Sequence, residues 1–488
     1  RHSKRKDNMK HYWHKIFALS FTALATTAWA NTDKLKLENC HLDGIKQQVQ
    51  CGTLQVPENY NKPEDGVISV NFAVLPAIDN SQNKEPLMFL AGGPGQAAVE
   101  LAGGLYEAFN EIRKTRDLIL VDQRGTGKSH PLQCDSVDGQ DPYTLVPEDF
   151  SIKDVQECIA ELEGDLSQFN SENAIRDFDE VRKALGHDKI NIYGGSYGTR
   201  AGLVYMRMFP ESLRAVVLDS VGPIEVPIGL FGKSAARSFE MLVSNCQMDA
   251  SCKAAYPNLA QEFAELAASL GESPVVQSIP HPRLGTKTDF VINKNKLINA
   301  IRMQLYSMQT RSLVPLVIHQ AYQGNYAPLA GLIAQTDGAM GMYVALTFNI
   351  VCNEDIPRVT EQDRMVDANN SFGGDISHMA WLTACPAWPQ YRPNEDFYQP
   401  VTADIPTLII SGDLDPVTPP SNGEFTAKTL PKSKHIVLKN SAHTPAPTTC
   451  AINVIDEFLT KLDPNGLDES CLEDIPSETF MTGLNGSI

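Results

Sequence analysis

The chain has 488 residues, about three times the ~150 residues of a typical domain, so we expect one or two large domains with a substantial core. Hydrophobic residues make up 42% of it and charged residues 20%, which excludes a disordered chain and a membrane protein with many spans. The formal net charge is -18 at pH 7, which argues against nucleic acid as a partner.

The first thirty residues are typical of an export signal. Met9, a candidate natural start, begins a short basic stretch, an apolar run follows over 16–28, and the run ends in Ala28-Trp29-Ala30, a small-x-small cleavage pattern. The run is shorter than the ~20 residues of a membrane-spanning helix, so an uncleaved anchor is the weaker alternative. We expect a signal peptide over 1–30, with 1–8 upstream of the natural start, and an exported protein, periplasmic or secreted, that is free of the membrane.

Ten cysteines follow this segment, and an even number in an exported chain predicts disulfide bonds. A metal site is the alternative, but the chain has no C-x-x-C and no Cys/His group with zinc-ligand spacing. We expect neither a metal nor another cofactor. We expect each cysteine to pair with its neighbour along the chain. The expected bonds join Cys40 to Cys51, Cys134 to Cys158, Cys246 to Cys252, Cys352 to Cys385 and Cys450 to Cys471.

Short apolar runs alternate with amphipathic stretches in the first half of the chain, as in an α/β domain. Apolar residues at helical spacing over 175–185 predict a helix that ends at Gly186. From about 223 to 400 the pattern is mainly helical, so we expect a sheet domain over 31–222 and 401–488, interrupted by a helical segment over 223–400. Strands are expected at 68–75, 87–90, 118–121, 190–193, 216–218, 407–410 and 435–438, with a last helix over 452–462.

Gly194-Gly195-Ser196-Tyr197-Gly198 lies between an expected strand and an expected helix. A G-x-S-x-G sequence in that context is typical of a nucleophile elbow, in which small residues beside the serine allow a sharp turn that exposes its Oγ. An ordinary Gly-rich turn is the alternative. We expect Ser196 to be a catalytic nucleophile.

The partners of such a serine follow it in the order acid, histidine. Asp415 comes just after an expected strand, and Asp413, two residues earlier, is its alternative. His443 lies in a loop beyond the last expected strand, where it can reach both the acid and the serine. In this arrangement His443 takes the proton of Ser196, and Asp415 orients the imidazole.

Negative charge that develops on a substrate carbonyl oxygen needs backbone N–H donors nearby. Tyr197 follows the expected nucleophile, and its amide is one expected donor. The second donor is expected from Gly92-Gly93-Pro94-Gly95, which follows the strand over 87–90. Pro94 has no N–H, so Gly93 and Gly95 are the candidates.

Together these motifs resemble those of the exported tripeptidyl-aminopeptidase and prolyl-aminopeptidase branch of the α/β-hydrolases. The resemblance rests on residues 90–95, 121–129, 193–199 and 412–419, in both halves of the expected sheet domain. It implies the α/β-hydrolase fold, a mostly parallel central sheet flanked by helices, with a large helical cap inserted between strands 6 and 7. It also implies a serine exopeptidase whose partners are peptides with a free N-terminus.

The resemblance also implies a substrate-binding site in the cap. In relatives, cap carboxylates bind the ammonium group of the substrate, and residues 351–355 resemble the cysteine-containing cap motif of the family. Glu354 is the expected ligand of that group, with Asp355 as its alternative. Two positions depart from the family pattern: Ala91, where prolyl relatives have His, and Gln96, where many relatives have Gly or Ser.

We therefore expect an exported serine aminopeptidase that releases one to three N-terminal residues through an acyl-enzyme on Ser196. An esterase or amidase that uses the same triad on small acyl substrates is the alternative, because fold and triad do not determine the acyl group. A binding protein on a hydrolase scaffold is a third hypothesis, but it has no need of a complete triad. Acetylation of the substrate N-terminus separates the first two, since only an aminopeptidase should lose activity.

Overall fold

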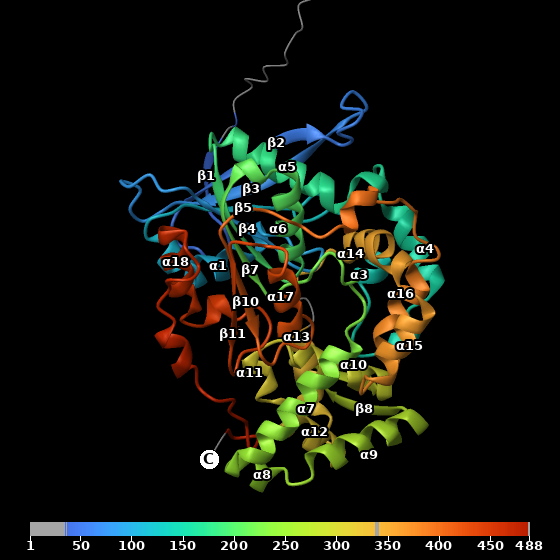
Figure 1. Cartoon of the computed structure of the whole chain (residues 1–488). Helices are drawn as coiled ribbons and strands as arrows, with labels where there is room; N and C mark the ends of the chain where they lie inside the picture. The colour runs from blue at the N-terminus through green and yellow to red at the C-terminus, as the bar shows by residue number, and fades with distance from the viewer. Residues whose placement is uncertain (1–34, 36, 337–340, 487–488) are drawn as a thin grey trace, which may run out of the picture. The chain divides into compact units, whose positions relative to one another are not determined.

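A nine-stranded sheet forms the centre of the fold (Figure 1). The structure, a computed structural model, describes residues 35, 37–336 and 341–486. The expected signal peptide lies outside the described residues. No helix in these ranges is long and apolar enough to cross a membrane.

The order of the strands is β1-β2-β3-β5-β4-β6-β7-β10-β11. The pairs from β5 to β11 are parallel, whereas β1, β2 and β3 extend one edge as antiparallel strands. Residues that follow the parallel strands therefore meet at one edge of the sheet. The strands are β1 (Glu38–Cys40), β2 (Val49–Pro57), β3 (Val67–Leu75), β4 (Leu87–Leu90), β5 (Leu118–Val121), β6 (Ile190–Gly195), β7 (Leu213–Asp219), β10 (Thr407–Gly412) and β11 (Ser433–Leu438).

All seven expected strands are present, with shifts of a few residues at their ends. The sequence pattern does not predict β1 and β2, because polar residues interrupt their apolar runs and both are partly solvent-exposed at the sheet edge. With β1 and β2 added to the five strands expected before it, the helical segment follows the seventh strand of the sheet in chain order rather than the sixth. It lies between β7 and β10.

Helices cover both faces of the sheet (Figure 1). Successive residues of a strand point to opposite faces, so Leu90 packs with α5 (Ser171–Ala184) and α6 (Tyr197–Met208), whereas Phe89 packs in the cluster of α1 (Ala102–Ala108) and α18 (Ala451–Lys461). The helix expected over 175–185 is confirmed as α5. It begins earlier than expected, because the Asn170 side chain accepts a hydrogen bond from the Asn173 amide and caps it.

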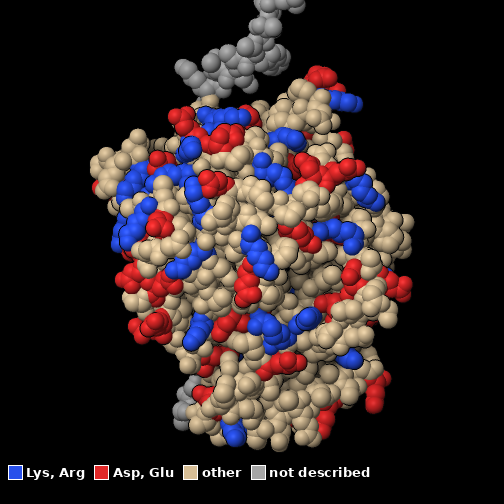
Figure 2. All heavy atoms as spheres, viewed as in Figure 1, with Lys and Arg blue, Asp and Glu red and all other residues tan. Residues whose placement is uncertain are grey.

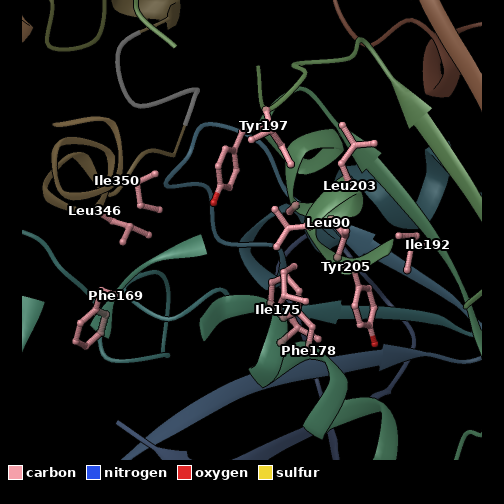
Figure 3. Packing of buried hydrophobic residues seen from close by; sticks show 14 of the residues in the cluster. Leu90, Phe169, Ile175, Phe178, Ile192, Tyr197, Leu203, Tyr205, Leu346 and Ile350 are labelled. Atoms are coloured by element: carbon pink, nitrogen blue, oxygen red, sulfur yellow. The ribbon is translucent and has the colours of Figure 1, made fainter. Parts of the chain in front are cut away.

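The segment between β7 and β10 has two parts that pack differently. Most helices from α7 to α13 share a hydrophobic cluster with the hairpin β8–β9, and Tyr143 and Phe480 join it from outside the segment. The sequence pattern does not predict this hairpin. Leu346 and Ile350 of α14 instead join the cluster of Ile175, Phe178 and Ile192 beside the sheet (Figure 3). The second part of the segment is therefore fastened to the sheet domain.

The remaining elements complete the chain. The hairpin strands are β8 (Val275–Pro280) and β9 (Lys287–Ile292). The other helices are α2 (Asn110–Arg113), α3 (Asp135–Asp138), α4 (Ile152–Glu161), α7 (Gly232–Met248), α8 (Ala250–Ala255), α9 (Leu259–Glu272), α10 (Lys294–Gln304), α11 (Met308–Arg311), α12 (Val314–Tyr322), α13 (Ala327–Thr336), α14 (Val344–Ile350), α15 (Glu361–Asn369), α16 (Met379–Ala384) and α17 (Pro420–Ala427).

Five disulfide bonds cross-link the fold, and their pairing confirms the expected one. They join Cys40–Cys51, Cys134–Cys158, Cys246–Cys252, Cys352–Cys385 and Cys450–Cys471.

On the face drawn in Figure 2, acidic and basic side chains are interspersed.

Candidate active site

Ser196 lies at the turn between β6 and α6, where the elbow motif predicts it. Its backbone has φ 56° and ψ -123°, a conformation that persists only where the surrounding structure imposes it. The flanking glycines make the turn possible. A Cβ atom on Gly194 would lie 2.2 Å from the Gly198 carbonyl oxygen, and one on Gly198 would lie 2.0 Å from the Leu90 carbonyl oxygen.

Ser196 lines a cavity of about 930 Å³ whose wall comes from both the sheet domain and the helical segment. The helical segment contributes a largely apolar wall, and the C-terminal stretch 475–479 contributes another part. No three His, Cys, Asp or Glu side chains of the described residues are grouped as metal ligands. The apolar residues from the helical segment include Val226, Leu230, Phe231, Met303, Met308 and Trp381.

His443 lines the same cavity, and its Nδ1 lies 2.8 Å from Asp415 Oδ2. Asp415 is fully buried and accepts hydrogen bonds from the amides of Val417 and Thr418, at 2.8 and 2.9 Å. Asp413, the alternative acid, accepts instead from a backbone amide of the histidine loop at 3.1 Å. The structure therefore brings Asp415, and not Asp413, to His443.

The two partners shift each other's pKa. Burial by itself would raise the pKa of Asp415, but the charge and hydrogen bond of His443 outweigh burial and lower it. Burial likewise opposes the charged form of His443, and the Asp415 carboxylate outweighs burial, so the pKa of His443 is raised. The pair is thus arranged to stabilise an imidazolium in the cavity that Ser196 also lines.

The loop that carries His443 packs closely on the end of β10. A Cβ atom on Gly412 would lie 2.0 Å from the Ala442 carbonyl oxygen, so the loop could not approach β10 in this way with a larger residue there. The amide of His443 donates to the Tyr306 carbonyl oxygen at 3.1 Å. The helical segment therefore also holds the loop.

Asp219, at the end of β7, supports the same loop. Its Oδ2 accepts hydrogen bonds from the Tyr193 hydroxyl at 2.6 Å and from the Ala446 amide at 3.0 Å, while Oδ1 is buried without a partner. Burial raises the pKa of Asp219 to about 7. The sequence pattern does not identify Asp219. The one feature that could have pointed to it is its place as a carboxylate at the end of a buried strand, at the sheet edge that carries Ser196.

The glycine loop after β4 packs beside Ser196. Of its two candidate oxyanion donors, Gly93 lines the cavity. Gly95 faces the helical segment, because a Cβ atom there would lie 2.7 Å from Thr347 Oγ1. Tyr197, whose amide is the other expected donor, begins α6 and lines the cavity. The geometry therefore favours Gly93 over Gly95.

Glu354 is buried behind the cavity wall. Its Oε1 accepts from the Ser171 amide at 2.9 Å and from the Tyr391 hydroxyl at 3.1 Å, and its Oε2 accepts from the Ser171 hydroxyl at 2.6 Å. The Ser171 hydroxyl is also 2.6 Å from the hydroxyl of Tyr197. Burial raises the pKa of Glu354 to about 7, although the hydrogen bonds from Ser171 oppose that rise. Ser171 and Tyr197 thus connect Glu354 to the cavity.

Asp355 binds other residues than Glu354 does. Its Oδ1 lies 2.8 Å from Arg200 Nη1 and 3.1 Å from Arg358 Nη2, and it also accepts from the Ile228 amide at 2.9 Å. Asp355 and Arg200 are both buried, so this ion pair lies within the protein. The structure does not bring Asp355 to the cavity wall.

Comparison with known proteins supports the α/β-hydrolase fold. Residues 85–281 match the family described as alpha/beta hydrolase fold, and residues 371–471 match the family described as TAP-like protein. The serine protease Hip1 of Mycobacterium tuberculosis is 27% identical over 459 residues, which cover 84% of each chain. The tripeptidyl aminopeptidase of Streptomyces lividans is 29% identical over 204 residues, 38% of this chain and 37% of that one. The proline iminopeptidase of Aeromonas sobria is 30% identical over 190 residues, 38% of this chain and 39% of that one.

The chain has the α/β-hydrolase fold, and the named relatives support the aminopeptidase branch of the enzymes with that fold. The match to the α/β-hydrolase fold includes Ser196 and the glycine loop, and the TAP-like match includes Asp415 and His443. Glu354 lies between the two matched stretches. The departure at Gln96 has a structural consequence in this α/β-hydrolase, because its side chain accepts a hydrogen bond from the Gly92 amide at 3.2 Å.

Proposed function

We propose that this α/β-hydrolase is an exported serine aminopeptidase that releases units of one to three residues from free peptide N-termini. The observation that carries the proposal is that one cavity is lined by Ser196, in a strained elbow, and by His443, which is bonded to Asp415. The relatives named as a serine protease, a tripeptidyl aminopeptidase and a proline iminopeptidase support a peptide bond as the target. The five disulfide bonds support export.

In the proposed reaction, His443 takes the proton of Ser196 while Oγ attacks the carbonyl carbon of the scissile peptide bond. The amides of Tyr197 and Gly93 stabilise the negative oxygen that forms. His443 then gives its proton to the leaving amine, the C–N bond breaks, and the N-terminal unit remains as an ester on Ser196. A water molecule, deprotonated by His443, hydrolyses that ester and releases the unit.

Glu354 is the candidate that directs the enzyme to free N-termini. Its carboxylate lies behind Ser171 and Tyr197, and its negative charge favours an ammonium group on that side of the cavity. An ammonium group in turn favours the ionised form of this carboxyl, whose pKa burial raises to about 7. Asp355 then acts as a positioning residue, because its ion pair with Arg200 fixes the stretch that carries Glu354.

The helical segment over 223–400 is proposed to be a cap on the sheet domain formed by 31–222 and 401–488. The cavity wall includes cap residues such as Phe231 and Trp381. A cap of this kind admits the end of a peptide more readily than the middle of a folded chain. The signal peptide over 1–30 is proposed to be removed on export.

A short synthetic peptide that begins Ala-Pro-Ala tests the proposal. Mass spectrometry of its products over time should show loss of an N-terminal unit of constant size. The Ser196→Ala variant should release no such unit and should unfold at the temperature of the wild type. Internal cuts or release from the C-terminal end would contradict an aminopeptidase, and turnover of aryl esters alone would favour the esterase.

A further inference from the structure

Two arginines line the cavity, and they differ in their partners. Arg200 is ion-paired with Asp355 at 2.8 Å and donates to the carbonyl oxygens of Pro223 and Val226. Arg302 forms no ion pair with any residue that the structure describes, and its Nε is buried without a hydrogen-bond partner. A guanidinium group on a cavity wall without a carboxylate partner is suited to bind an anionic ligand.

Glu478 does not neutralise this charge. Among the described residues of the cavity wall it is the one carboxylate, and its Oε1 lies 2.7 Å from Arg311 Nε. Asn245 donates to its other oxygen at 2.9 Å. Both oxygens of Glu478 are therefore engaged, and the charge of Arg302 remains available to a ligand.

Arg302 and Tyr306 line the same cavity as His443, and Tyr306 packs against His443. Arg302 stands in the last turn of α10, and Tyr306 follows just after that helix. Burial raises the pKa of Tyr306, and the Arg302 guanidinium, which interacts with the Tyr306 hydroxyl, opposes that rise. The rings of Tyr306 and His443 have centroids 5.2 Å apart, and the Tyr306 carbonyl accepts from the His443 amide at 3.1 Å.

We propose that Arg302 and Tyr306 form a subsite for the C-terminal carboxylate of the leaving peptide, so that short peptides with a free C-terminus are the preferred substrates. This inference rests on the proposed peptidase function. His443 gives its proton to the leaving amine, so the leaving peptide lies on the side of Ser196 where Tyr306 and Arg302 stand. A guanidinium group can donate two parallel hydrogen bonds to a carboxylate, and the phenol hydroxyl can donate a third.

The charges around the cavity fit a short zwitterionic peptide. Glu354 lies behind Tyr197 and favours the ammonium end, whereas Arg302 lines the cavity together with Tyr306 and binds the carboxylate end. A longer leaving peptide carries its carboxylate beyond the reach of Arg302. The preference for a free C-terminus should therefore fade as the leaving peptide lengthens.

Matched pairs of peptides test the subsite. Each pair shares the N-terminal unit and the cleaved bond, and differs only in a C-terminal acid or amide; leaving peptides of increasing length are compared at constant pH and ionic strength. For the shortest pair, kcat/KM of the acid should exceed that of the amide by about tenfold, as expected for a charge-assisted hydrogen bond. For the longest pair the ratio should approach one.

Three variants assign the effect to Arg302. Arg302→Gln should bring the ratio to one by lowering kcat/KM for the acid alone, and Arg302→Lys should keep part of the preference. Lys253→Gln removes an exposed cation of α8 away from the cavity and should leave the ratio unchanged. Equal kcat/KM for acid and amide in the wild type, or an equal loss for both in Arg302→Gln, would overturn the subsite.

A second readout separates this inference from the proposed function. If no peptide is cleaved, the proposed function fails, and the leaving peptide is then used as an inhibitor of aryl ester hydrolysis. Tighter inhibition by the acid than by the amide, lost in Arg302→Gln, would support the subsite on its own. Equal inhibition by both forms would overturn it.

Discussion

The amide of Ala446 donates to the Asp219 carboxylate at 3.0 Å, so the loop that carries His443 is fastened to the end of β7. The Tyr193 hydroxyl donates to the same oxygen at 2.6 Å, which holds the carboxylate in place. Tyr193 belongs to β6, the strand that ends at the elbow. The strand that positions Ser196 therefore also positions, through Asp219, the loop of its proposed base.

Asp219→Asn should be tolerated, whereas Asp219→Ala should lower both stability and kcat. Asparagine keeps one oxygen that can accept from both Ala446 and Tyr193, so kcat and stability should stay near those of the wild type. Alanine leaves two donors buried without an acceptor, which should cost about 1–3 kcal/mol of unfolding free energy and lower kcat through a looser His443. Urea unfolding and steady-state kinetics measure both effects. Equal damage from the two substitutions would mean that the charge, and not the acceptor, is what the loop requires.

The pH profile should report the pKa of His443. The imidazole acts as a base only when neutral, and Asp415 raises its pKa above the ordinary 6.5, so kcat/KM should rise with pH with a midpoint above that value. Asp415→Asn removes the charge that favours the imidazolium. The midpoint of this variant should fall below that of the wild type, and the rate should drop by a factor on the order of 10⁴. An unchanged midpoint in Asp415→Asn would show that the titrating group is not His443.

Glu354→Gln should raise KM for peptides with a free N-terminus and leave KM for aryl esters nearly unchanged. The substitution removes the negative charge behind Tyr197, and an ester without an ammonium group does not respond to that charge. For the wild type, KM of free-amine peptides should also increase as pH falls through about 7, because Glu354 becomes protonated there. Glu361→Gln, at an exposed position of α15, is the matched control. An equal change for peptides and esters would remove the assigned role of Glu354.

The disulfide bonds should stabilise the fold to different extents. In the chain-entropy description, loss of Cys352–Cys385, with a sequence separation of 33, should cost about 4 kcal/mol of unfolding free energy. Loss of Cys246–Cys252, with a separation of 6, should cost about 2 kcal/mol. Double Cys→Ser variants compared by denaturant unfolding measure the difference. A larger cost for the shorter loop would show that local packing, and not loop closure, dominates.

Local sequence was sufficient to predict the elements that carry the proposed triad. The elbow depends on residues beside Ser196, such as Gly194 and Gly198, and a glycine two places before or after a serine is visible in the chain itself. The positions of Asp415 and His443 follow from strand ends, which apolar runs predict well. The disulfide pairs could be predicted for the same reason, since each joins neighbours along the chain.

Such local patterns could not predict contacts between residues that lie far apart in the sequence. The motif around Glu354 predicts a cap carboxylate, but its burial depends on Ser171, which lies 183 positions earlier. Asp355 is the alternative to Glu354 because it is the next acid in the same motif, and only the structure reveals that Arg200 engages it. The support of the histidine loop by Asp219 joins residues 227 positions apart.

The most direct test of the aminopeptidase account is hydrolysis of Ala-Pro-Ala p-nitroanilide with a free and with an acetylated N-terminus. The account predicts that only the free form is cleaved, and mass spectrometry of the products gives the size of the released unit. Equal cleavage of the acetylated form would contradict an enzyme that recognises the ammonium group. Cleavage of neither form, with turnover of a simple aryl ester, would assign the cavity to small acyl substrates instead.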